Sequence, residues 1–71
     1  MPSYCVNKNQ QTNGDHEVHD LTAGKCIRLP DPQNRVDLGY HTVCSSAVLK
    51  AKQTYRQSNG CYYCTPTCHT S

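Results

Sequence analysis

Cysteines near the C-terminus give the clearest chemical signal in the chain. Cys61 and Cys64 are separated by two residues, and Cys68 and His69 follow closely. Two thiolates at the first spacing can turn inward on a tight knuckle and occupy two corners of a zinc tetrahedron. The sequence therefore predicts that this knuckle supplies part of a Zn²⁺ site that holds the fold together.

The remaining ligands of such a site must come from a distant part of the chain. His19 ends a short alternating segment and Cys26 follows one loop later, so both can converge on the knuckle. We therefore expect four metal ligands: His19, Cys26, Cys61 and Cys64. The reserve metal candidates are Cys68 and His69. The fourth position also stays open to Cys5 or His16.

Other chemistries of these residues are less well supported by their spacing. A redox CxxC pair usually begins a helix, whereas this one follows a helical segment, and Pro66 leaves little room for another helix. His16 and His19 belong to an HExH string, but on a strand they point to opposite faces. We expect no enzyme activity. A thiol-reactive protein, acting by redox exchange or as an alkyl acceptor, stays an alternative.

Composition explains why the fold needs a staple. The 71 residues contain six Cys, no Phe and no Trp, and only ten Val, Leu and Ile together. This aliphatic fraction lies below the ~20% at which ordinary cores become doubtful. A chain this short forms one small domain, residues 1–71, and small chains with thin cores usually carry disulfides or a metal.

The cellular compartment decides between disulfides and a metal. The sequence contains no apolar run resembling a signal-peptide core or a membrane span, so we expect a cytoplasmic protein without a membrane partner. Structural disulfides are uncommon in that compartment, which favours metal. The formal net charge is only +2. A nucleic-acid-binding zinc module stays an alternative, and its contact residues would be Arg28, Arg35, Lys50, Lys52, Tyr62 and Tyr63.

Alternation of apolar and polar residues predicts three strands, at 3–7, 16–19 and 35–40, with a hairpin joining the first two. One helix follows, capped by Thr42 or Ser45 and ended by Ser58-Asn59-Gly60. Its apolar face is formed by Cys44, Ala47, Val48, Ala51 and Tyr55. We expect Cys44 to act as a small buried apolar residue there. The predicted fold is α+β, with a small two- or three-stranded antiparallel sheet, one helix and a C-terminal Cys knuckle.

Several strings in the chain resemble a small uncharacterised bacterial protein family. They are YCVNKN at 4–9, HEVH at 16–19, GCYYC at 60–64 and CHTS at 68–71. A looser likeness, in the order His, Cys, helix and CxxC, is to the zinc-binding module of the DNA-repair protein Ada. That likeness implies zinc ligation by Cys26, Cys61 and Cys64, with His19 fourth. It implies methyl transfer from DNA only with a basic DNA-facing surface, which these scattered charges do not form.

The sequence as a whole favours a structural zinc-binding module that serves as an adaptor or interaction domain. It does not identify the partner, and both a protein and a nucleic acid stay open.

Overall fold

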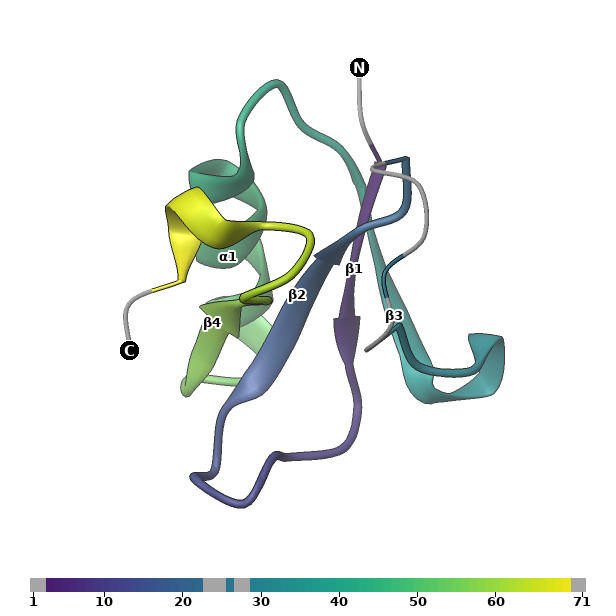
Figure 1. Cartoon of the computed structure of the whole chain (residues 1–71), viewed down its shortest axis with the longest axis vertical. Coiled ribbons are helices and arrows are strands. Elements are labelled where there is room, and N and C mark those ends of the chain that lie inside the picture. Colours follow the sequence, from purple (N-terminus) through teal and green to yellow (C-terminus); the bar gives the residue numbers. More distant parts are fainter. Residues whose placement is uncertain (1–2, 23–25, 27–28, 70–71) are drawn as a thin grey trace.

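The computed structural model describes residues 3–22, 26 and 29–69. Its elements in chain order are β1 (Ser3–Asn7), β2 (His16–Asp20), the 3₁₀ turn η1 (Pro32–Asn34), β3 (Arg35–Tyr40), α1 (Cys44–Thr54), β4 (Ser58–Gly60) and the 3₁₀ turn η2 (Pro66–Cys68). Within the described residues, the strands form one four-stranded sheet in the order β3-β1-β2-β4, with α1 beside it (Figure 1). The α+β class is confirmed, but the sheet has four strands where two or three were predicted, and it is mixed rather than wholly antiparallel.

The three predicted strands pair around β1. β2 and β3 both run antiparallel to it, and Val6 lies opposite Val18 on one side and Val36 on the other. One residue earlier, Cys5 lies opposite His19 and Asp37. Because side chains alternate along a strand, this register separates a valine face from a face that carries cysteine, histidine and carboxylates. The predicted hairpin and its alternation are confirmed.

α1 packs on the valine face of the sheet. The buried core consists of Tyr4, Val6, Val18, Leu38, Ala47 and Ala51. The two alanines let the helix backbone approach the strands closely, and the predicted apolar face is confirmed. The predicted caps are wrong: Val43 is the N-cap and its side chain makes no capping hydrogen bond, and α1 ends at Thr54. Among the described residues, no helix is long and apolar enough to cross a membrane.

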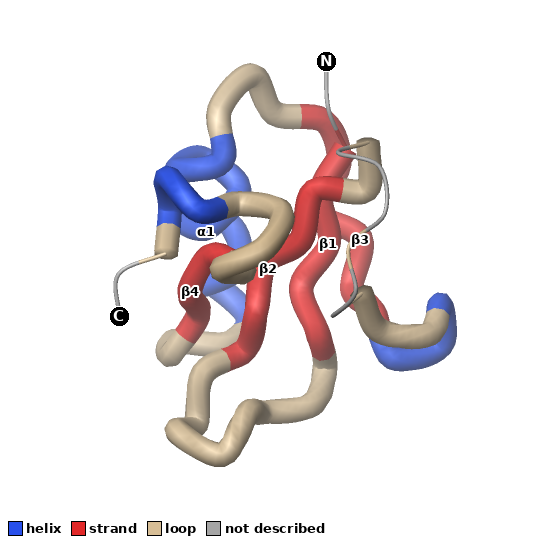
Figure 2. The backbone as a smooth tube through the Cα atoms, viewed as in Figure 1, coloured by secondary structure: helices blue, strands red, loops and turns tan. Residues whose placement is uncertain are grey.

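The fourth strand replaces the predicted end of the helix. β4 lies beside β2 (Figure 2). The two strands pair in parallel, with Ser58 opposite His16 and Gly60 opposite Val18. Its polar residues are buried, and the Ser58 hydroxyl donates a hydrogen bond of 2.6 Å to the carbonyl oxygen of Tyr55. Alternating hydrophobicity could not predict such a short polar strand. Because β4 pairs with β2, the next residue, Cys61, lies beside the middle of β2.

Candidate metal centre

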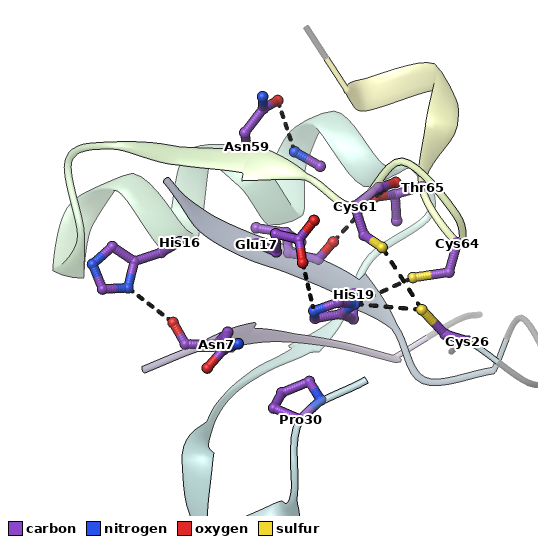
Figure 3. A network of polar contacts seen from close by, with 12 residues as sticks. Asn7, His16, Glu17, His19, Cys26, Pro30, Asn59, Cys61, Cys64 and Thr65 are labelled. Atoms are coloured by element: carbon purple, nitrogen blue, oxygen red, sulfur yellow. Dashed lines mark hydrogen bonds and ion pairs between the residues drawn. The ribbon is translucent and has the colours of Figure 1, made fainter. Parts of the chain in front are cut away.

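The structure brings the four predicted ligands together. His19 comes from β2, Cys26 from the segment after β2, and Cys61 and Cys64 from the turn after β4 (Figure 3). One ligand atom from each lies within 4.8 Å of every other, so the group could hold a metal ion. His19 and Cys61 are fully buried, whereas Cys26 and Cys64 are half-buried.

Three distances within the group match the edges of a metal-centred tetrahedron. With a Zn–S bond of about 2.3 Å and a Zn–N bond of about 2.0 Å, the expected edges are about 3.8 Å between sulfurs and about 3.5 Å between sulfur and nitrogen. The Sγ atoms of Cys26 and Cys61 are 3.7 Å apart. His19 Nδ1 lies 3.7 Å from Cys26 Sγ and 3.5 Å from Cys64 Sγ. A disulfide would require about 2 Å between sulfurs, so these three cysteines are free thiols.

Backbone hydrogen bonds form the knuckle and attach it to β2. The amide of Cys61 donates to the carbonyl of Val18 at 2.9 Å, which continues the β2–β4 ladder for one more residue. The amide of Thr65 donates to the carbonyl of Cys61 at 2.9 Å and closes the turn. The amide of Asp20 donates to Cys64 Sγ at 3.4 Å, a contact that stabilises a thiolate there. The turn is thus held in place by the strand that carries His19.

Glu17 lies on the other side of the histidine. His19 Nδ1 faces the sulfurs, and Nε2 lies 3.8 Å from the carboxylate of Glu17, which is itself buried (Figure 3). This separation is longer than a hydrogen bond, so the carboxylate acts on the ring by electrostatic attraction. With Nδ1 toward a metal, Nε2 carries the proton, and a nearby carboxylate favours that tautomer. Sequence reasoning missed Glu17, although its position two residues before His19 places both on one face.

The charge of the site depends on whether a metal is bound. Burial raises the pKa of the thiols of Cys61 and Cys64, so without a metal both hold their protons at neutral pH. A divalent ion at the centre of the group would displace those protons and compensate the buried thiolates. Three cysteines and one histidine are a known donor set of structural zinc sites, and the residues present fit this metal.

The reserve candidates do not belong to the group. Cys68 forms a disulfide with Cys44, the first residue of α1. The expectation that Cys44 is only a small apolar residue is therefore wrong, although it does pack against the core. His69 Nδ1 lies 3.0 Å from the carbonyl oxygen of Gly60. The predictions for Cys68 and Cys44 failed because nothing local in the sequence indicates that η2 folds back onto the start of α1.

The remaining candidates for the fourth position lie apart from the sulfurs. Cys5 is buried opposite His19 in the β1–β2 register, but it is not a member of the ligand group. His16 points to the other face of the sheet, as predicted, where its ring stacks on Tyr55 at 3.9 Å. Its Nδ1 lies 2.9 Å from the carbonyl oxygen of Asn7.

The residues proposed for nucleic-acid contact do not gather on one surface. Arg35 lies with Cys5 on the face away from α1, and its Nε donates to the carbonyl of Pro30. Lys50 and Lys52 are exposed on α1, which covers the opposite face. Tyr62 and Tyr63 are exposed beside the knuckle and contact each other edge to face. Arg28 lies outside the described residues.

Comparison of the chain with protein-family models, with curated proteins and with solved structures found no match. The resemblances seen in the sequence therefore stay expectations, and the site must be interpreted from its own geometry.

Proposed function

We propose that the protein is a structural zinc-binding module that acts as an adaptor or interaction domain in the cytoplasm. The single observation that supports this most strongly is the spacing of the four ligand atoms: all lie within 4.8 Å of one another, and three of the distances match edges of a zinc tetrahedron. Four protein ligands would close the coordination sphere and leave no position for a substrate. The role that fits such a site is structural, and we propose no enzyme activity for it.

Zinc is the metal that this donor set favours. Thiolate sulfur and imidazole nitrogen are soft to borderline ligands, and a tetrahedral arrangement of them selects zinc over magnesium or calcium, which prefer oxygen. Zinc would also supply the energy that the core lacks. Structural zinc contributes on the order of 10 kcal/mol of coupled folding free energy, compared with roughly 2 kcal/mol for burying one valine side chain.

Native mass spectrometry of protein purified without added metal tests the proposal. We expect one zinc ion per chain. Acidification should release it, because the thiolates take up protons again. A folded chain of metal-free mass would contradict the proposal.

Single substitutions then identify the ligands. Cys26→Ser, Cys61→Ser and Cys64→Ser should each reduce zinc content, and His19→Ala should do the same. Cys5→Ser is the matched control, because Cys5 is equally buried on the same face yet lies outside the ligand group. If Cys5→Ser lost zinc as readily as Cys61→Ser, the assignment of the ligands would be wrong.

A further inference from the structure

A second cross-link shares the C-terminal segment with the metal centre. The disulfide between Cys44 and Cys68 joins the first turn of α1 to η2, and Cys68 follows Cys64 by only four residues. The same short segment is thus held at one end by the ligand group and at the other by the helix. Neither the zinc proposal nor the packing of the core explains this second anchor.

The structure between the two anchors is tightly connected. The buried hydroxyl of Thr65 lies 3.0 Å from the carbonyl oxygens of both Val18 and Cys61. The amide of Cys68 donates to the carbonyl of Thr65 at 3.0 Å. Cys68 also packs directly on Gly60, where an added Cβ would come within 2.7 Å of the Cys68 backbone. A displacement of Cys68 is therefore transmitted to the residues that flank Cys61.

The disulfide is open to solvent on two sides. Cys44 and Cys68 are both half-buried. Cys44 lines a surface groove of about 290 Å³ that is also lined by the metal-facing residue Cys64. Cys68 lines a second groove, of about 300 Å³, together with Val48 and Leu49. A small dithiol can therefore approach the bond without unfolding the protein.

Local chemistry determines which sulfur leaves. Cys44 begins α1, whose first-turn amides have no side-chain cap and no acidic neighbour. The Thr67 hydroxyl lies 3.3 Å from Cys44 Sγ. Both features stabilise negative charge on that sulfur, and the sulfur that better carries the charge leaves faster. A thiolate should accordingly attack Cys68 Sγ and release Cys44 as the thiolate.

We propose that the Cys44–Cys68 disulfide is a thiol–disulfide exchange site whose state sets how tightly the metal is bound. An incoming dithiol forms a mixed disulfide with Cys68 as the Cys44–Cys68 bond breaks. The second thiolate of the dithiol then attacks the dithiol's first sulfur, which is bonded to Cys68 in the mixed disulfide, and releases the Cys68 thiolate. The dithiol becomes a cyclic disulfide, and its two electrons and two protons pass to Cys44 and Cys68.

Once reduced, the C-terminal segment loses one of its two anchors, so Cys61 and Cys64 hold the metal less tightly. By linkage, bound metal must make the disulfide harder to reduce by the same factor by which reduction lowers the equilibrium affinity for the metal. This inference rests on the proposed zinc site.

The test is competition for zinc with a chromophoric chelator, brought to equilibrium. Zinc-loaded wild-type protein, the double variant Cys44→Ser/Cys68→Ser and the control Cys5→Ser are compared. We expect a zinc affinity about tenfold lower for the double variant and unchanged for the control. Equal affinity of wild type and double variant would overturn the coupling alone. A wild-type protein that binds no zinc would instead overturn the proposed function.

A second measurement uses wild-type protein, in case the double variant does not fold. The protein is equilibrated in mixtures of reduced and oxidised dithiothreitol, with free zinc fixed by a metal buffer, and thiols are trapped by alkylation and counted by mass. We expect the metal-loaded protein to need a reduced-to-oxidised ratio at least about tenfold higher for half reduction, because removal of zinc also removes the fold that holds the disulfide in place. The same ratio with and without zinc would overturn the proposal.

Discussion

The two faces of the sheet hold the molecule together in different ways. On the face covered by α1, the buried strand side chains are mostly apolar, and Val6 and Val18 are fully covered. On the opposite face, the same strands bury Cys5, Glu17 and His19. Because successive residues of a strand point to opposite sides, one short stretch of β2 contributes to both.

The difference teaches where stability must come from in a chain this small. An apolar face gains a little from each methyl group that leaves water, and here α1 contributes only two buried alanines. A buried polar face is costly unless each charge and donor has a partner. A metal ion would supply that partner for three cysteines and a histidine at once. We therefore expect the polar face to be the more sensitive of the two.

Removal of the metal is expected to have the largest effect. Loss of on the order of 10 kcal/mol of coupled folding energy is comparable to the whole stability of a small domain, so excess chelator should unfold the chain. Far-UV circular dichroism and amide hydrogen exchange, recorded before and after chelation, measure this. If the β2 amides stayed protected from exchange without metal, the apolar face rather than the polar face would contribute most of the stability.

A substitution on the apolar face should cost much less. Val18→Ala removes a fully buried side chain and should lower the free energy of unfolding by about 2 kcal/mol. Zinc content should stay at one per chain, since the backbone of β2 is retained. Urea denaturation at fixed free zinc measures the change. Leu49→Ala is the control on α1, because Leu49 is 67% exposed and its loss should leave the midpoint nearly unchanged.

The contact between Glu17 and His19 should have a smaller effect, confined to the metal. Glu17→Gln removes the charge that lies 3.8 Å from His19 Nε2, and zinc affinity should fall by about tenfold. Competition with a chromophoric chelator measures the affinity. Asp37→Asn removes a charge of the same type at an exposed position of β3 and serves as the control. An equal loss in both variants would mean that net charge, rather than the orientation of His19, controls the affinity.

The parts of the fold that follow from local pattern could be predicted from the sequence. Alternation located β1 and β3 with their observed bounds, and spacings of three and four located the apolar face of α1. His19 could be chosen because it ends a strand, and Cys26 because it follows one loop later. Chain order restricts which cysteines can reach a histidine at a strand end, and the structure indeed brings these two to the knuckle.

The missed features depend on pairs that are distant in the chain. β4 contains Ser58, Asn59 and Gly60, which are poor strand formers, and the ladder to β2 makes them a strand. The disulfide was missed because Cys44 fits the apolar stripe of a helix equally well. Its pairing with Cys68 requires η2 to fold over Gly60. The sequence does not indicate which segment will pack on that glycine.

Cys5 offers the mildest test of the polar face, because it is buried there without being a metal ligand. Burial raises its pKa from 9.0 to about 11. Between these values the unfolded chain releases the thiol proton and the folded chain keeps it, so stability should fall as pH rises from 9 to 11. Cys5→Ala removes this one contribution. The variant should therefore lose less stability than wild type over the same interval.

Urea midpoints for both proteins, measured below pH 9 and again near pH 11, give this difference directly. Any cavity left by the alanine changes both midpoints of the variant alike, so it cancels when the two pH values are subtracted. Parallel losses in the two proteins would mean that Cys5 titrates normally in the folded state. In that case the polar face would be open to water around Cys5, and only the thiolates of the knuckle would need a compensating positive charge.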